Sequence, residues 1–161
     1  MSEKIQAITN QILVFTLDDL SYGIPIYAVI KVYHAVEVMP LPKAPKVVAG
    51  IINVKGQIIP VLDIRKILGL RQCEMELFNR LVLVNTGKRI VALWVDSVNG
   101  LLKLDINQQL DYQKQFPFSE LMSGAIKVDE GLIFIYNLDR FLCNDEEYEL
   151  EQALKYETYE A

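Results

Sequence analysis

Short apolar runs separated by clusters of turn residues recur along this chain, and this pattern predicts many short β-strands and few helices. Asp18, Asp19, Ser21 and Gly23 mark the first turn, and the run 26–32 is expected to be the return strand of the first hairpin. The other strands are expected over residues 12–17, 47–54, 57–62, 81–85, 90–95, 98–104, 124–128 and 132–136. Irregular loops are expected over residues 39–45, 72–79 and 105–118.

Two neighbouring β-rich runs meet at Lys55-Gly56, where the sequence predicts a tight hairpin with Gly56 at a positive φ. Pro60 lacks a backbone donor, so the second of these runs is expected to be an edge strand or to end there. Asp63 occupies the N-cap position of a short helix that Gly69 ends. This unit contains no nucleophile and no metal-ligand cluster, so it indicates a binding module and not a catalyst.

The hairpin pattern occurs twice. Segments 50–59 and 124–134 each open with a Gly and continue as an apolar strand, a Gly turn and a second apolar strand. A short helical segment follows each of them. The repetition favours two small β-barrels of similar build, although sequence alone separates barrels from sandwiches poorly.

Charge is unevenly distributed along the chain, whose hydrophobic fraction of 52% is that of a globular protein. Of 21 acidic and 16 basic residues, seven acids and one base lie from Asn144 onward, which leaves 14 acids and 15 bases and a net charge of +1 in the remainder. No basic stripe with interleaved aromatic residues is present, so nucleic acid is not an expected partner.

The chain divides into a leader over residues 1–10, a globular region over 11–143 and an acidic tail over 144–161. Leu150, Ala153 and Leu154 would form an apolar stripe on a helix in the tail. The stripe is short and the surrounding charge is acidic, so a frayed, solvated helix is favoured. Without a signal-peptide core or a run long enough to cross a bilayer, we expect a cytoplasmic protein with no membrane insertion.

The chemically suggestive residues lack partners at the required spacing. His34 has no neighbouring ligands, and Gly87-Lys88 lacks the flanking residues of a phosphate loop. Cys73 and Cys143 are expected to be reduced thiols, and Trp94 is expected to be a core residue. We therefore expect no catalytic residue, no metal and no cofactor. An oligonucleotide- or sugar-binding OB-like module and a small hydrolase stay open as alternatives, although a basic stacking groove and a nucleophile–base pair are missing.

Several motifs in a fixed order resemble the CheW-type coupling proteins of bacterial chemotaxis. The resemblance covers roughly residues 11–142. The family signature of a Gly, apolar residues, Asn-Leu-Arg-Gly, Pro-Val and Asp-Leu-Arg stands here as Gly50, Ile51, Ile52, Asn53, Val54, Lys55, Gly56, Pro60, Val61, Leu62, Asp63, Ile64 and Arg65. The other matching pieces are Tyr22 to Pro25, Leu41 to Pro45, Trp94 to Val98 and Ser123 to Val128.

The resemblance implies an all-β fold of two SH3-like five-stranded β-barrel subdomains packed together, with short helices and a groove between them. It also implies a non-enzymatic adaptor that couples methyl-accepting chemoreceptors to a CheA-type histidine kinase. The implied contacts for the receptor's cytoplasmic tip are Val29, Lys31, Gly50, Lys55 and Gly56. The implied kinase contacts are Leu41, Pro42 and Val47 on the first barrel. Such a protein would act at membrane-associated receptor arrays.

Three positions depart from the family pattern. Lys55 replaces an Arg and so keeps the charge but not the planar fork, which pairs with a carboxylate through two hydrogen bonds. Lys31 and Gly100 stand where the family often has Glu. The chain therefore resembles a divergent member, which would serve a specialised taxis or pilus-motility system.

Overall fold

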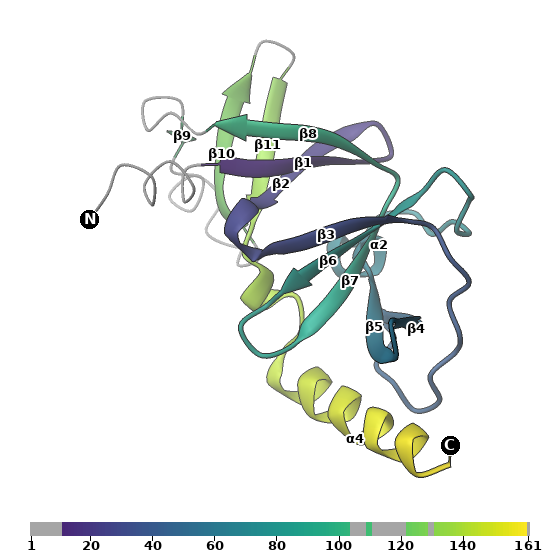
Figure 1. The fold of residues 1–161 in the computed structure, drawn as a ribbon. Helices are drawn as coiled ribbons and strands as arrows, with labels where there is room; N and C mark the ends of the chain where they lie inside the picture. Colours follow the sequence, from purple (N-terminus) through teal and green to yellow (C-terminus); the bar gives the residue numbers. More distant parts are fainter. Residues whose placement is uncertain (1–10, 104–108, 111–121, 129–130, 161) are drawn as a thin grey trace.

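The computed structural model describes residues 11–103, 109–110, 122–128 and 131–160, and the strands in these ranges form two sheets (Figure 1). The six-stranded sheet has the order β8-β1-β2-β11-β10-β9, with bounds Ser97–Lys103, Gln11–Leu17, Leu20–Pro25, Gly131–Tyr136, Met122–Val128 and Gln109–Leu110. The five-stranded sheet has the order β3-β6-β7-β5-β4, with bounds Val29–His34, Arg80–Asn85, Ile90–Val95, Gln57–Asp63 and Val48–Val54. The helical elements are η1 (Ile26–Ala28), α2 (Ile64–Leu68), η3 (Leu138–Arg140) and α4 (Asn144–Glu160).

The two sheets repeat one topology, as the paired hairpins in the sequence predicted. In the five-stranded sheet β3, β6 and β7 are antiparallel, β7 pairs parallel with β5, and β5 pairs antiparallel with β4. In the other sheet β8, β1, β2, β11 and β10 follow the same sequence of pairings. The pairing register shifts beside Gly50 in the β4–β5 hairpin and beside Gly124 in the β10–β11 hairpin. The prediction of two similar SH3-like subdomains is confirmed.

Among the described residues, the buried apolar side chains form three clusters, one within each subdomain and one between the two sheets. On β6, Leu81 and Leu83 pack into the five-stranded unit, while Val82 and Val84 pack into the shared core. On β1 the alternation is the same, with Ile12 and Val14 in one cluster and Leu13, Phe15 and Leu17 in another. Strands buried on both faces have nearly unbroken apolar sequences, which explains why these runs do not alternate with polar residues.

The predicted hairpin of the β4–β5 unit is confirmed in detail. Lys55 and Gly56 both have positive φ, at 51° and 86°, as a two-residue turn between twisted strands requires. Asn53 Oδ1 accepts a hydrogen bond of 2.8 Å from the Gly56 N–H. Asp63 is the N-cap residue of α2, although its side chain makes no capping hydrogen bond, and Gly69 ends the helix in the left-handed conformation.

Two strand predictions were wrong. The return strand of the first hairpin is β2 and not residues 26–32, because Asp18 and Asp19 alone make the turn, both with positive φ. The chain leaves the ladder at Pro25 through η1, and β3 pairs with β6 in the other sheet. Strand β5 lies between β7 and β4 and is not an edge strand. Its parallel pairing with β7 begins at Val61, so Pro60 lies just outside that ladder and can be accommodated there.

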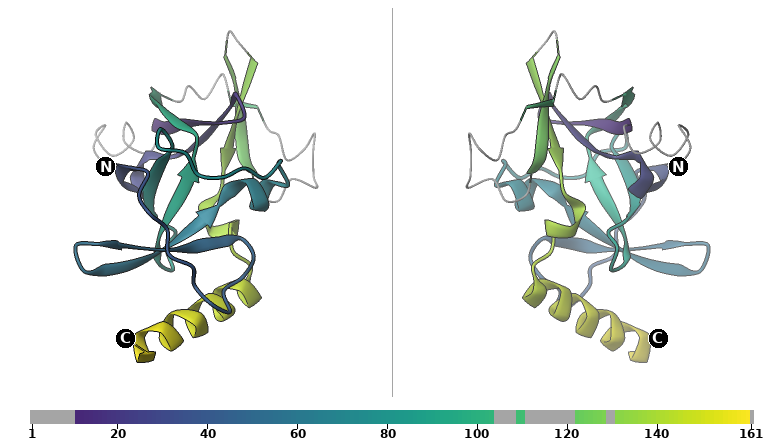
Figure 2. Two further views of the ribbon diagram at one scale, coloured as in Figure 1. Left: turned by 90° about the vertical axis from the view of Figure 1, so that its right-hand side faces the viewer. Right: turned by 90° about the vertical axis from the view of Figure 1, so that its left-hand side faces the viewer.

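The prediction of a frayed, solvated tail was also wrong. Helix α4 runs beneath the five-stranded sheet, and the β4–β5 hairpin extends to one side of the molecule (Figure 2). Leu150 is fully buried, Ala153 is nearly so, and both belong to the shared core. An ion pair of 2.8 Å between Arg89 and Glu147 holds the first turns of the helix to the β6–β7 hairpin. The tail is therefore part of the folded unit.

The leader and most of the predicted loop at 105–118 lie outside the described residues. The other strand predictions agree with the structure to within one or two residues at each end.

Candidate functional site: docking surfaces and the charged junction that positions them

A partly buried ion cluster joins the two subdomains. Arg65, from α2, donates to Asp18 Oδ1 at 2.8 Å and to Asp96 Oδ2 at 2.6 Å through the same Nη2 atom. Asp18 lies in the β1–β2 turn, and Asp96 lies between β7 and β8, so the three residues come from both sheets. The Asp96 N–H also donates to Thr16 O, at 3.0 Å. The Arg65 side chain is only 3% exposed, and its two ion pairs link the β1–β2 turn to the connection between β7 and β8.

The cluster shifts the ionisation of its members. Burial alone would raise the pKa of the Asp96 carboxyl. Hydrogen bonds from Arg65 and from the Asp18 N–H, together with the Arg65 charge, lower the pKa by more than burial raises it, so the net shift is downward. The pKa of Arg65 is raised, chiefly by its hydrogen bond to Asp96 and against the opposing effect of burial. The charged forms of both residues are therefore favoured in the folded protein.

Acid is expected to weaken the folded state through Asp96. Because the pKa of Asp96 is lower in the folded than in the unfolded chain, its contribution to stability is fully present above its ordinary value of 3.8. That contribution is lost as the pH falls below this value and through the lower pKa of the folded state. Asp96→Asn should lower the urea midpoint of unfolding at pH 7. In this variant the urea midpoint should also fall less steeply with acid than it does in the unchanged protein. Urea unfolding at a series of pH values measures both effects. The exposed turn residue Asp19, changed to Asn, serves as the control, and an acid decline that is as steep in Asp96→Asn as in the unchanged protein would contradict the assignment.

Four of the five residues implied for receptor contact fall into two groups. Lys55 and Gly56 are exposed at the tip of the β4–β5 hairpin. Val29 and Lys31 lie on β3, which is at the other end of this sheet's strand order from β4. The Lys31 ammonium lies 4.9 Å from the centre of the Tyr33 ring. The structure therefore separates the two groups along the sheet.

Gly50 has a different environment from the other four. It is buried, and a Cβ atom there would clash with the Met39 carbonyl oxygen and lie 2.7 Å from the Val38 side chain. Met39 and Ile51 exchange backbone hydrogen bonds of 2.8 and 2.9 Å beside it. Gly50 thus allows the loop over residues 39–45, which we call the Pro-rich loop, to close over β4, and it offers no side chain to a partner.

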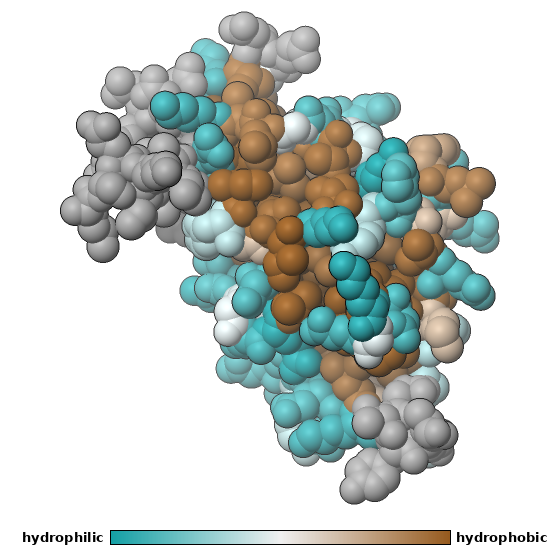
Figure 3. All heavy atoms as spheres, viewed as in Figure 1, coloured by the Kyte–Doolittle hydropathy of each residue, from teal (hydrophilic) through white to brown (hydrophobic). Residues whose placement is uncertain are grey.

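An apolar band crosses the face that includes β3. Figure 3 shows hydrophobic residues gathered over β8 and β1 and down to the beginning of β3. The elements at this face carry exposed large apolar side chains, including Tyr27 on η1, Ile30 on β3 and Leu101 on β8. These residues carry no distinguishing sequence signal, because they stand inside apolar runs like those of core residues.

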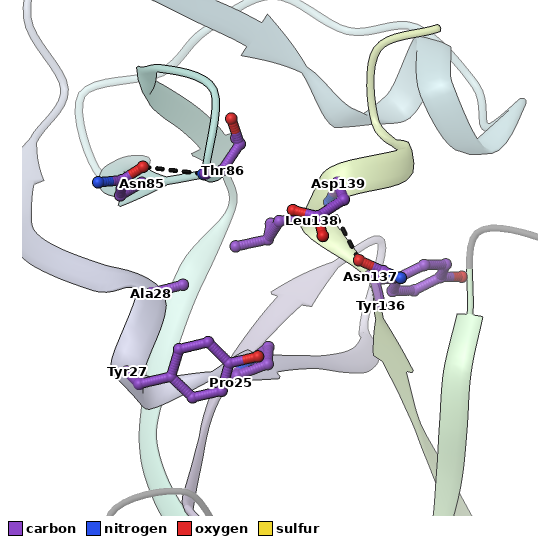
Figure 4. A pocket seen from close by; sticks show the side chains of 10 residues that line it. Pro25, Tyr27, Ala28, Asn85, Thr86, Tyr136, Asn137, Leu138 and Asp139 are labelled. Carbon is purple, nitrogen blue, oxygen red and sulfur yellow. Dashed lines mark hydrogen bonds between the residues drawn. The ribbon is translucent and has the colours of Figure 1, made fainter.

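A groove of about 530 Å³ lies between the subdomains, as the family resemblance implied. Figure 4 shows Pro25 and Tyr27 on one side of it and Asn85, Thr86, Leu138 and Asp139 on the other. Hydrogen bonds from the Gly87 N–H to Asn85 Oδ1 and from the Asp139 N–H to Asn137 Oδ1 hold its polar rim. None of the five residues implied for receptor contact lines this groove, although Ala28, which does, is adjacent to Val29.

The residues implied for kinase contact are mostly covered. Leu41 is 8% exposed and belongs to the same core cluster as Leu150 of α4, and Val47 is half-buried against that cluster. Pro42 is exposed. The Lys43 ammonium lies 4.7 Å from the centre of the Tyr156 ring, so α4 reaches the Pro-rich loop. Of the three residues, Pro42 alone has a side chain open to a partner in this conformation.

The remaining chemical candidates have ordinary environments. Trp94 is buried and donates to Asn79 Oδ1 at 3.1 Å, and Gly87 lies in the β6–β7 turn. Cys73 and Cys143 are both exposed and free. The described ranges hold no group of three or more His, Cys, Asp or Glu side chains placed to bind a metal ion. In the same ranges, no helix combines the length and apolar character needed to cross a membrane.

The fold and surfaces define an all-β protein of two SH3-like subdomains, with exposed apolar and charged surfaces suited to binding other proteins. The family model of the CheW-like domain matches residues 11–146. The chain therefore belongs to the CheW-like domain family.

Relatives and a solved structure agree with this assignment. The chain is 28% identical to the chemotaxis protein CheW of Thermotoga maritima, over 82% of this chain and 87% of that protein. It is 26% identical to the chemotaxis protein CheW of Rhizobium meliloti, over 91% and 97% of the two chains. It is also 29% identical to the protein FrzA of Myxococcus xanthus, over 57% and 58%. The crystal structure of the scaffolding protein TtCheW from Thermoanaerobacter tengcongensis matches with a TM-score of 0.74 and 27% identity, and the match covers 86% of this chain and 95% of that one.

Proposed function

We propose that this protein is a non-catalytic adaptor that couples chemoreceptors to a CheA-type histidine kinase in bacterial taxis or pilus-motility signalling. The observation that carries the proposal is the match of residues 11–146 to the CheW-like domain, together with the similarity of fold to a scaffolding protein. The ion pairs of Arg65 with Asp18 and Asp96 support it, because an adaptor must hold two partners in a fixed relation and these contacts link the two subdomains. Such a role would bring the protein to the cytoplasmic tips of receptors in membrane-associated arrays.

The receptor tip is proposed to bind across the apolar face that includes β3 and to reach the β4–β5 turn. Ile30 and Val29 would supply apolar contact, and Lys55 would supply a positive charge at the exposed hairpin tip. Gly56 would keep that tip in its turn conformation, and Gly50 would shape the surface from below. Lys31 would add a second positive charge, so this chain's receptor is expected to be more acidic than those of relatives with Glu at that position.

The kinase is proposed to bind the five-stranded subdomain at the Pro-rich loop. Pro42 is the exposed member of the residues implied for this contact, and Leu41 and Val47 would support it from the core. Because α4 packs against the same loop, its presence is expected to matter for kinase affinity. A typical contact of this kind would have a micromolar Kd, which corresponds to about -8 kcal/mol.

The Lys55→Glu variant is expected to bind receptor about tenfold or more weakly, because it places a like charge against an acidic partner. Kinase affinity should barely change, since that contact lies elsewhere on the subdomain, and Lys55→Arg should preserve receptor binding or strengthen it. Co-sedimentation with receptor-containing membranes measures the first effect and calorimetry with the kinase measures the second.

Lys88, another exposed lysine in a hairpin turn, provides the matched control when it is changed to Glu. Equal receptor binding by Lys55→Glu and the unchanged protein would show that the receptor site does not include this turn.

A further inference from the structure

An apolar cavity of about 550 Å³ opens on the side of the five-stranded subdomain where β3 ends, and none of the residues considered above for receptor or kinase contact lines it. Figure 1 shows the segment after β3 and the segment before β6 on this same side. A backbone hydrogen bond of 3.1 Å from the Ala35 N–H to Asn79 O joins the two segments. The lining residues are Ala35, Val36, Glu37, Val38, Ala49, Glu74, Met75, Glu76, Leu77 and Trp94. We call this feature the Trp94 groove.

The groove has a fixed shape because Asn79 holds its wall. Asn79 is only 3% exposed, and its Oδ1 accepts from Trp94 Nε1 at 3.1 Å and from the Glu76 N–H at 2.7 Å. A buried polar side chain with its hydrogen bonds made in this way orders the loop from residue 70 to residue 79 against the sheet. A preformed groove loses little conformational entropy when a partner binds.

The rim is apolar and unusually exposed. Leu77 is 91% exposed and its neighbour Phe78 is 64% exposed, and Val36 across the groove is about half exposed. Side chains of this size rarely gather at an open cavity on a protein that acts alone, and such gatherings mark interaction sites.

The charged residues that line the groove are all acidic, and the nearby Arg80 guanidinium donates to the backbone carbonyls of Phe78 and Asn79. Glu37, Glu74 and Glu76 are exposed, and none of them has an ion-pair partner among the described residues. Three carboxylates around an apolar floor attract a positively charged partner and repel an acidic one. This is the reverse of the charge at the hairpin tip, where Lys55 lies.

We propose that the Trp94 groove is a docking site for a segment of a partner protein that presents a large apolar side chain flanked by lysines or arginines. The apolar side chain would enter over Met75 and Trp94, and its basic neighbours would pair with the three glutamates. No residue proposed above for receptor or kinase contact lines the groove, although Ala49, which does, is adjacent to Gly50.

Trp94 is the sole tryptophan of the chain, so its fluorescence reports directly on this groove. The probe is a short synthetic peptide that lacks tryptophan and has a Leu-Phe core between lysines, and the comparison peptide carries glutamates in place of the lysines. The lysine peptide should change the Trp94 emission in a saturable way, bind about tenfold more tightly than the glutamate peptide and weaken as salt is raised. Absence of saturable binding, or equal affinity for the two peptides, would overturn the proposal.

Two sets of variants localise the effect. Glu74→Lys combined with Glu76→Lys should lower affinity for the lysine peptide about tenfold, and Leu77→Ser, at a fully open position, should also weaken binding. Glu149→Lys combined with Glu151→Lys on the exposed face of α4 makes the same change in net charge elsewhere and should leave affinity unchanged. An equal loss in this control pair would mean that net charge, and not the groove, attracts the peptide.

Discussion

Replacement of Arg65 by Met should lower the free energy of unfolding by about 2–4 kcal/mol, one of the two largest effects expected of a single substitution in this chain. The change keeps the apolar stem but leaves Asp18 and Asp96 without the cation that both contact. Removal of one partner from a fully buried ion pair costs about 3–5 kcal/mol, and we expect less here because Asp18 is 47% exposed and water can solvate it. Thermal and urea unfolding measure the loss.

Arg71→Met provides a matched control, since Arg71 is exposed just beyond α2. That variant should unfold within about 0.5 kcal/mol of the unchanged protein. If Arg65→Met were equally neutral, the junction would not hold the subdomains together. The Arg65→Met variant could instead fold normally at neutral pH and bind receptor and kinase singly, but fail to bring the two together. That result would show that the junction sets the relative position of the subdomains more than it stabilises the fold.

The second large effect concerns α4. Leu150→Ala should cost about 2–5 kcal/mol, because the side chain is fully buried in the core shared by the two sheets and its removal leaves a cavity there. At about 2–4 °C per kcal/mol for a chain of this size, the melting temperature should fall by roughly 5–15 °C. Calorimetry or circular dichroism measures this shift.

Glu151→Ala, at the exposed neighbouring position of the same helix, controls for helix propensity and should change little. A chain shortened to end before Asn144 should be destabilised at least as much as Leu150→Ala, since it loses Leu150, Ala153 and the Arg89–Glu147 ion pair together. Full stability of the shortened chain would restore the interpretation of the tail as a solvated appendage.

Local sequence signals predicted the elements whose conformation depends on their own residues. The β4–β5 hairpin was predictable because Lys55-Gly56 selects one turn geometry, and the end of α2 was predictable because Gly69 adopts the left-handed conformation readily. Strands β6 and β7 were predictable because strands buried on both faces must be apolar throughout. These signals act over a few residues and need no knowledge of the tertiary structure.

The errors came from features that depend on distant partners. Residues 26–32 contain β-forming side chains, but Pro25 and η1 turn the chain away from β1, and β3 finds its partner about fifty residues later in β6. The stripe of Leu150, Ala153 and Leu154 is too short to stabilise an isolated helix, and the shared core supplies the stabilisation. Neither outcome can be inferred from a local window of sequence.

The candidate contact residues came from the family resemblance and not from local sequence signals, and they stay predictions. The resemblance directed attention to Lys55 and Pro42, which the structure places at exposed positions, and to Gly50 and Leu41, which it buries. Arg65 was visible only as a member of a motif, because its partners Asp18 and Asp96 come from turns that lie far away in the sequence. The Trp94 groove carries no sequence signal, since its wall depends on the buried hydrogen bonds of Asn79.

Co-sedimentation of the kinase with receptor-containing membranes tests the central proposal most directly. Purified CheA-type kinase and membranes that carry the chemoreceptors, both from the source organism, are mixed with and without this protein, and the kinase in the pellet is measured. An adaptor should raise the pelleted kinase in a saturable way, and Lys55→Glu should abolish most of that increase. The same amount of pelleted kinase with and without the protein, for every receptor and kinase pair tested, would contradict the proposed coupling function.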